Sequence, residues 1–266
     1  MLFEFENVSF SYLGKFPALN DINLRINAGE KIAFLGANGS GKSTLLSLAA
    51  GLVYPQKGIF RAFGRVINED TLNGGEFRKY FRSKVGILFQ NSDTQLFCPT
   101  VEEELYFGPK QLDLSYDKMK ESIDKVAEVL NINKLLDRPI YRLSMGEKRR
   151  VAIASILVVE PEVLILDEPT AGLDPRTCAE LIDLISLYHQ QGKTVISTTQ
   201  DLHILPDIAD KVYILSEAKT IAACGNCEDI LSDEALLDSH NLIHVHRHKH
   251  THDWHRHPHR HINPGP

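Results

Sequence analysis

Apolar positions along the chain form either short continuous runs or runs at helical spacing. The continuous runs, rich in Val, Ile and Leu, predict buried strands at residues 31–35, 85–89, 163–166, 194–198 and 211–215. Helical patterns between them predict helices at residues 43–50, 119–130, 149–159, 177–191 and 205–209. Because the buried strands alternate with helices, we expect an α/β fold with a parallel sheet.

Two segments depart from this alternation. Residues 91–159 contain predicted helices and no obvious strand, so we expect a helical subdomain there. After residue 243 the composition shifts to histidine and leaves little to bury, so we expect residues 236–266 to end in a disordered tail without a ligand. The α/β core is then formed by residues 1–90 and 160–235.

Length and charge restrict the kind of protein. A chain of 266 residues suits one large domain with a small subdomain. The net charge is −6 although residues 244–266 carry four basic side chains against one acidic, and so acidic a body argues against binding nucleic acid. No apolar run approaches the ~20 residues of a membrane helix, and the N-terminus lacks a signal-peptide pattern. Four irregularly spaced cysteines suit a reducing compartment, so we expect a soluble intracellular protein.

A glycine-rich motif predicts a phosphate site. Residues 36–43, GANGSGKS, match G-x-x-x-x-G-K-[ST] between a predicted strand and a predicted helix. The backbone N–H groups of such a loop face phosphate oxygens, Lys42 reaches the β- and γ-phosphates, and Ser43 can bind Mg²⁺. A plain glycine turn is the alternative, which the full pattern in this context disfavours. The predicted nucleotide site comprises Gly36, Ala37, Asn38, Gly39, Ser40, Gly41, Lys42, Ser43 and Thr44.

Two carboxylates follow the predicted strand 163–166. Ligands of open α/β sheets bind at the carboxyl ends of the strands, where Asp167 and Glu168 lie. Asp167 would hold Mg²⁺, and Glu168 would polarise the attacking water. Two solvated acidic side chains are the alternative, but the phosphate motif in the same chain favours a catalytic pair.

Three further motifs connect these sites to a known family. They are LSMGE at 143–147, AGLD at 171–174 and Gln90 within ILFQNSDTQLF. Over residues 1 to about 235 the chain resembles the nucleotide-binding subunit of an ATP-binding cassette (ABC) transporter. The resemblance implies a P-loop NTPase core and an ATPase coupled to transmembrane transport.

The resemblance also implies roles for single residues. Gln90 would be the Q-loop glutamine that contacts Mg²⁺, and Tyr12 would lie against adenine. Ser144 and the N–H of Gly146 lie at a predicted helix N-terminus, which favours an anion. In this family the signature of one chain faces the phosphate loop of another. A homodimer or a heterodimer with a paralogue is therefore expected.

Two segments narrow the resemblance within the family. Residues 90–109 and 206–215 are similar to energy-coupling-factor (ECF) cassettes, which power uptake of vitamins or of cobalt and nickel. This implies a peripheral location at the cytoplasmic face of the membrane, with a coupling subunit and a substrate-binding subunit as partners. For four apolar residues, contact with the coupling subunit and burial in the subdomain core both remain open: Phe97, Val101, Leu105 and Phe107.

Three positions differ from the family pattern. Met145 replaces a signature glycine, and Glu147 replaces the usual glutamine. Gln200 occupies the position of the switch histidine, where it can donate a hydrogen bond to the γ-phosphate but cannot carry charge. His203 is the alternative switch residue, although a surface position in a helix suits it better. Because Glu168 is present, we expect ATP hydrolysis.

Residues 244–261 form a histidine tail. Alternating residues of an extended chain lie on one side, and neutral imidazole suits Ni²⁺ and Co²⁺. An inert solvated tail and an engineered tag are alternatives, and the interrupting Arg, Lys, Trp254 and Pro258 argue against a tag. The candidate ligands are His244, His246, His248, His250, His252, His255, His257, His259 and His261.

A CxxC pair, Cys224 and Cys227, precedes the histidine tail. One such pair is weak support for a metal site, and the alternative is a turn in which Asn226 caps the next helix. The structural position of the two thiols distinguishes these interpretations.

Together these features predict an ATPase subunit that energises uptake of nickel or cobalt. ATP and Mg²⁺ are the expected ligands, with Ni²⁺ or Co²⁺ on the tail. The alternatives are a cassette for vitamin uptake, a non-transport ABC ATPase, and a metal-storage or sensing protein. Non-transport members usually carry two cassettes or a long coiled-coil insertion, and this sequence shows neither.

Overall fold

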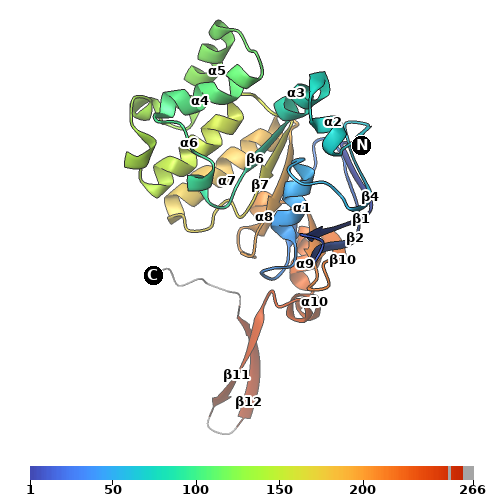
Figure 1. Cartoon of the computed structure of the whole chain (residues 1–266). Coiled ribbons are helices and arrows are strands. Elements are labelled where there is room, and N and C mark those ends of the chain that lie inside the picture. Colours follow the sequence, from blue (N-terminus) through green and yellow to red (C-terminus); the bar gives the residue numbers. More distant parts are fainter. Residues whose placement is uncertain (251–252, 260–266) are drawn as a thin grey trace. The chain divides into compact units, whose positions relative to one another are not determined.

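The computed structural model describes residues 1–250 and 253–259, and from residue 244 onward only the backbone (Figure 1). The chain divides into two compact units. Met1–Asn68 and Ile185–Pro266 form the first unit, and Glu69–Leu184 form the second.

An antiparallel sheet in the first unit has the strand order β2-β1-β4-β5. Alternate residues of β1 are buried, and the rings of Phe5 and Phe60 stack with centroids 4.4 Å apart. This half-buried pattern is typical of a sheet with one solvated face. The bounds are β1 (Phe3–Tyr12), β2 (Phe16–Ile26), β4 (Lys57–Ala62) and β5 (Arg65–Val66).

The first unit also holds the parallel strands that carry the phosphate loop. Strand β3 (Lys31–Leu35) lies between β8 (Thr194–Thr198) and β9 (Lys211–Leu215) and runs parallel to both. Strand β10 (Ile221–Asn226) pairs antiparallel with β9. Nearly every residue of β3, β8 and β9 is buried, which explains their continuous apolar sequences. The helices of this unit are α1 (Lys42–Ala49), α8 (Leu205–Ile208), α9 (Cys227–Ser232) and α10 (Glu234–Ser239).

The second unit is mainly helical around one parallel strand pair, β6 (Val85–Leu88) and β7 (Val163–Leu166). A Cβ atom on Gly86 of β6 would lie 2.2 Å from the Ile156 side chain, so glycine lets α6 pack closely on this strand. The helices are α2 (Glu69–Leu72), α3 (Gly75–Lys84), α4 (Val101–Gln111), α5 (Tyr116–Val129), α6 (Met145–Leu157) and the larger part of α7 (Pro175–Gln190). Short 3₁₀ turns are η1 (Ser92–Thr94), η2 (Asn133–Leu135) and η3 (Ile140–Arg142).

The predicted α/β P-loop fold with a mostly parallel sheet and helices is confirmed. Strands β3, β7, β8 and β9 have the predicted bounds. The elements named above between residues 91 and 159 are all α-helices or 3₁₀ turns. Helix α6 begins at Met145, four residues before the predicted start at residue 149. The earlier start has a local cause, because Ser144 and Glu147 form a capping box.

Residues of the histidine tail form an antiparallel pair, β11 (His244–His250) and β12 (Asp253–His259). The alternation of histidine with other residues has the period of a strand, which allows the pairing. Two of the predicted metal ligands, His252 and His261, lie outside the described residues.

Candidate active site

The phosphate loop lies between β3 and α1 in the first unit. Gly41 has a φ of 106°, and a Cβ atom there would lie 2.3 Å from the carbonyl oxygen of Ala18. Only glycine fits this conformation and this close contact. Gly41 is also the N-cap of α1 and supplies no side-chain hydrogen bond to the helix. The first N–H groups of α1 therefore have no capping side chain and can donate to an anion.

Two polar groups in this loop fit a bound phosphate. The Ser40 hydroxyl is buried, with the side chain 1% exposed, and Oγ has no hydrogen-bond partner among the described residues. Lys42 Nζ donates to the carbonyl oxygens of Gly36 (2.7 Å) and Ala37 (3.2 Å), so the ammonium lies against the loop itself. A buried hydroxyl and an ammonium at a helix N-terminus match the donors of a triphosphate site.

Two other predicted residues lie beside the loop in the same unit. The Tyr12 hydroxyl is 3.2 Å from Oγ1 of Thr44, and the side chain of Tyr12 is half exposed. Gln200 follows β8, and its Nε2 donates to Oδ1 of Asn38 at 2.6 Å. His203 is exposed in the following turn. The structure therefore places Gln200, and not His203, in contact with the phosphate loop.

The predicted carboxylates follow β7 in the second unit. Asp167 is 7% exposed, and its backbone N–H donates to the carbonyl oxygen of Leu88 at 2.9 Å. A buried carboxylate at a strand end is a suitable oxygen ligand for Mg²⁺. Glu168 is half-buried. Its φ of 44° lies in the left-handed region, which is uncommon for residues other than glycine. Strain at such a position is typical of functional residues.

The signature lies at the N-terminus of α6. Ser144 Oγ accepts from the N–H of Glu147 (3.3 Å), and Glu147 Oε2 accepts from the N–H of Ser144 (2.8 Å). The second bond lowers the pKa of Glu147, and a glutamine oxygen could accept the same bond. This explains locally why glutamate is tolerated here. The Ser144 hydroxyl keeps its own proton to donate to a ligand.

The AGLD segment lies beside the signature. A Cβ atom on Gly146 would lie 3.6 Å from Thr177 Oγ1, and one on Gly172 would lie 3.9 Å from the sulfur of Met145. Asp174 caps α7 by accepting from the Thr177 hydroxyl at 2.6 Å, and this bond lowers the pKa of Asp174. The second unit thus brings the two motifs together as an exposed surface.

Gln90 is exposed directly after the β6 region. The four apolar residues that follow divide into two pairs. Val101 and Leu105 are fully buried core residues of α4. Phe97 and Phe107 are 64% and 41% exposed, and their rings meet edge to face with centroids 4.7 Å apart. The subdomain core therefore accounts for only half of this set.

Sequence reasoning missed Arg149. Its side chain is 3% exposed, and its guanidinium donates to carbonyl oxygens of both the Gln90 and Glu168 segments. In the sequence it lies in a Lys-Arg-Arg run that is typical of a solvated helix face. Only its helical spacing hinted at burial, because Ile153 and Ile156, four and seven residues further on, lie on the same face of the helix.

The CxxC pair does not form a thiol pair site. Cys224 is exposed on β10, whereas Cys227, the first residue of α9, is buried in a hydrophobic cluster. Asn226 caps α9 by accepting from the N–H of Asp229 at 2.8 Å, which confirms the capping interpretation.

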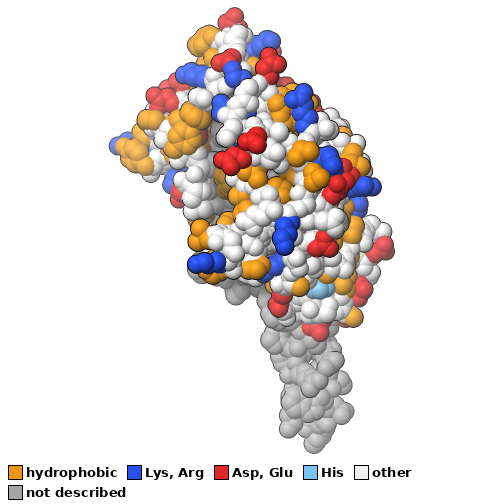
Figure 2. All heavy atoms as spheres, turned by 45° about the vertical axis from the view of Figure 1, so that its right-hand side comes forward, with side chains coloured by type: hydrophobic (Ala, Val, Ile, Leu, Met, Phe, Trp, Pro, Cys, Tyr) orange, Lys and Arg blue, Asp and Glu red, His pale blue; other side chains and the backbone are white. Residues whose placement is uncertain are grey.

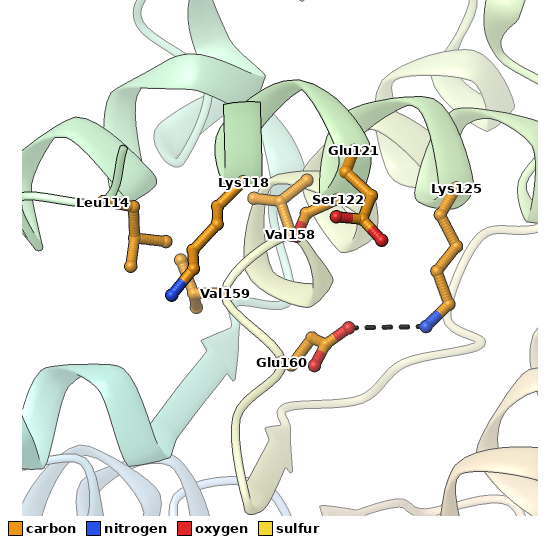
Figure 3. Close-up of a pocket in the computed structure, with 8 residues that line it drawn as sticks. All are labelled: Leu114, Lys118, Glu121, Ser122, Lys125, Val158, Val159 and Glu160. Atoms are coloured by element: carbon orange, nitrogen blue, oxygen red, sulfur yellow. Dashed lines mark hydrogen bonds and ion pairs between the residues drawn. The ribbon is translucent and has the colours of Figure 1, made fainter. Parts of the chain in front are cut away.

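A separate cavity of about 340 Å³ lies in the second unit between α5 and the end of α6 (Figure 3). Its charged lining is balanced, because it has two lysines, Lys118 and Lys125, and two glutamates, Glu121 and Glu160. Lys125 pairs with Glu160 at 3.4 Å. None of the predicted site residues lines this cavity.

Among the described residues, surface charge, helix hydrophobicity and metal-ligand clusters do not extend the candidate site. On the face seen in Figure 2, acidic and basic side chains are interspersed. In the described part of the chain no helix is long and apolar enough to cross a bilayer. Among side chains that the structure describes, no three His, Cys, Asp or Glu residues gather as a metal site.

The predicted site residues thus occur in two sets. The first unit holds Tyr12, the phosphate loop and Gln200. The second unit holds Gln90, Asp167, Glu168 and the signature. Each set has the donors or carboxylates that its predicted role requires.

Comparison with known proteins gives these sets a family. Residues 19–171 match the sequence profile of ABC transporters. The nickel import ATP-binding protein NikO of Rhodobacter capsulatus is 42% identical over 244 residues, which cover 91% of this chain and 95% of that protein. The solved structure of cbiO1 from Clostridium perfringens, part of the ABC transporter complex cbiONQ, is 35% identical. It covers 91% of this chain and 94% of its own, with a TM-score of 0.75.

A second solved structure shows a related nucleotide-bound state. The dimeric post-hydrolysis state of the ATP-binding cassette MJ0796, with ADP and Pi, is 25% identical and covers 85% of this chain and 99% of its own, with a TM-score of 0.74. The family implies use of ATP and Mg²⁺, and the donors of the phosphate loop and the Asp167 carboxylate fit both. The chain belongs to the ABC transporter family as an ATP-binding cassette, an ATPase coupled to transport.

Proposed function

We propose that this cassette energises import of a divalent transition metal, nickel or cobalt. It would work at the cytoplasmic face of the membrane, bound to a coupling subunit and a substrate-binding subunit. The supporting observation is a combination within one chain. A relative named for nickel import is 42% identical over 91% of the chain, and nine histidines follow the cassette between residues 244 and 261.

In this proposal two cassettes are required for one ATP site. Each chain carries the phosphate loop in one unit and the signature in the other. The exposed Ser144 hydroxyl and the N–H of Gly146, at the N-terminus of α6, would donate to the γ-phosphate bound by a partner cassette. The partner is a second copy of the chain or a paralogue.

The residues within the cassette divide the chemical work. Lys42, the α1 N-terminus and Ser40 would bind the phosphates, and Tyr12 would contact the adenine. Mg²⁺, held by Ser43, Asp167 and Gln90, would neutralise phosphate charge when bound. Glu168 would accept a proton from the attacking water.

Gln200 would act as the switch residue through a neutral hydrogen bond. Its amide nitrogen already donates to Asn38 of the phosphate loop, at 2.6 Å. Nucleotide would compete for this donor, because the γ-phosphate is a stronger, charged acceptor than an amide oxygen. Gln200 would then exchange its bond to Asn38 for one to the phosphate.

An uptake assay tests the proposed cargo. The chain, expressed with the membrane subunits of its transporter, should support accumulation of labelled nickel or cobalt in cells without another uptake system. Glu168→Gln should abolish accumulation while leaving the amount of assembled complex unchanged. Uptake of a labelled vitamin in place of metal would contradict the cargo but leave the ATPase assignment intact.

A further inference from the structure

The histidine tail places histidines opposite one another on two strands. Strand β11 pairs antiparallel with β12, and three rungs of the ladder have histidine on both sides: His244 with His259, His246 with His257, and His248 with His255. Directly opposite residues of a ladder share a face, and so do residues two apart on a strand. All six histidines therefore belong to one face of the hairpin.

The spacing of these positions suits a metal ion. Cβ atoms of opposite residues lie about 5 Å apart, and positions two apart along a strand lie about 6.6 Å apart. Two neighbouring histidine rungs thus place four histidine positions close together on this face. We propose that this face is a binding site for Ni²⁺ or a chemically similar divalent transition-metal ion, with two adjacent histidine rungs as its minimum. The site does not depend on the cargo proposed above.

The opposite face of the hairpin supports coupled folding and binding. Arg247 lies directly opposite Arg256, and like charges in that arrangement destabilise a strand pair. An isolated two-stranded hairpin is also marginal in water. Metal bound to the histidine face would offset both costs, because the free energy of binding to a site absent from the unfolded chain stabilises the fold.

A phase-shifted variant of the full-length chain tests the register. His246→Arg, Arg247→His, His248→Lys and Lys249→His together retain the composition and the number of histidines. They leave no two neighbouring rungs with four histidines. The matched control, Arg247→Lys with Lys249→Arg, changes the same strand and moves no histidine.

Nickel chloride titrated by calorimetry should bind the phase-shifted variant at least about tenfold more weakly than the wild type, because preorganisation is lost. The control should bind like the wild type. Equal affinities in all three proteins would overturn the proposal, since an unregistered histidine-rich chain would then account for binding. Failure of nickel to bind the wild type would also overturn it.

A second, independent observation concerns Arg149 of α6. Its guanidinium donates from Nη1 to the carbonyl oxygens of Phe89 (2.7 Å) and Gln90 (3.1 Å). From Nη2 it donates to those of Pro169 (2.8 Å) and Glu168 (3.3 Å). One side chain of the signature helix therefore joins the Q-loop to the segment of the catalytic glutamate.

Burial of the charged Arg149 guanidinium is unfavourable on its own. Burial lowers the pKa of Arg149 to about 10, and a buried charge is unfavourable unless its hydrogen bonds are made. The planar fork of arginine can meet two carbonyl groups on each side, which an ammonium cannot do. The shape of this side chain, and not only its charge, is thus matched to the two segments.

The Glu168 backbone explains why such a support is useful. Its φ of 44° lies in the left-handed region, which is strained for glutamate and persists only where neighbours enforce it. We infer that Arg149 is a positioning residue that holds the Glu168 backbone in this conformation and fixes it relative to Gln90. This inference rests on the assignment of Glu168 as the residue that activates water.

The test compares Arg149→Lys with Arg150→Lys. Arg150 is the next residue of α6, and its guanidinium lies 3.8 Å from the exposed Glu180 carboxylate. Arg149→Lys should lower kcat about tenfold, equal to about 1.4 kcal/mol, with the ATP Kd within about twofold of the wild type. Arg150→Lys should leave both quantities near the wild type.

Two results would overturn the positioning role. An unchanged kcat in Arg149→Lys would show that the fork is not needed. A parallel loss of ATP affinity and thermal stability would show a general structural role. If Arg149→Lys is unstable at the assay temperature, single-turnover hydrolysis at a lower temperature, where ATP binding confirms folding, gives the same comparison.

Discussion

The phosphate loop and the histidine tail differ in what holds their ligand groups in place. In the loop, Gly41 at a φ of 106° packs against Ala18, and Ser40 is buried, so the backbone geometry is fixed before any ligand arrives. In the tail, the groups are repeated side chains on a two-stranded hairpin. The loop needs particular residues at particular positions. The tail depends on number and register, and a single substitution should matter less there.

The largest effect on ATP hydrolysis should come from removing the proposed general base, Glu168. Glu168→Gln should lower steady-state ATP turnover on the order of 10²-fold or more, because a general base contributes that much. ATP binding should remain, since Lys42 and the α1 N-terminus lie in the other unit, and a nucleotide-bound dimer should accumulate. Turnover and size-exclusion chromatography with ATP check this. Hydrolysis by Glu168→Gln at nearly the wild-type rate would show that Glu168 is not the general base.

Two alanine substitutions separate close packing from backbone strain in the loop. Gly41→Ala adds a Cβ 2.3 Å from a carbonyl oxygen, whereas Gly39→Ala, at a φ of 77°, meets no atom within 4 Å. We expect Gly39→Ala to cost about 1 kcal/mol of stability through strain alone, and Gly41→Ala to cost about 1–3 kcal/mol more. Denaturant unfolding measures both. Equal costs would mean that packing against Ala18 is unimportant.

The switch position should respond more weakly. Gln200→His should raise ATP turnover about fivefold at most, because one stronger hydrogen bond is worth about 1 kcal/mol. The advantage should shrink as the pH rises through the ordinary histidine pKa of about 6.5, since the charged form is then lost. The wild-type residue does not titrate. Turnover of both proteins between pH 6 and 8 is the measurement, and an unchanged or lower rate would place the switch elsewhere.

The continuous runs of apolar residues correctly predicted the strands that are buried on both faces. Strands β3, β7, β8 and β9 are continuous apolar runs, so their bounds could be read directly. The antiparallel sheet built on β1 and β2 escaped because it is half-buried, and alternation interrupted by bulges gives a weaker signal. Long-range pairing is not encoded in local spacing.

The same limit applies to the site. Motif spacing predicted roles for the phosphate loop, Asp167 and Glu168, because each chemistry needs neighbouring residues in the chain. Arg149 escaped because its four carbonyl acceptors come from two segments that are distant in sequence. The exposure of Phe97 and Phe107, against the burial of Val101 and Leu105, likewise depends on how α4 packs.

Truncation after Ile243 tests most directly whether the loop and the tail are separate sites. Ile243 is itself buried in a hydrophobic cluster of the first unit, so the cut preserves the core. ATP hydrolysis and nickel binding are measured on the truncated and full-length proteins side by side. The account predicts ATP turnover within about twofold of the full chain and loss of most bound nickel. Loss of ATPase activity, or nickel binding that survives the truncation, would contradict it.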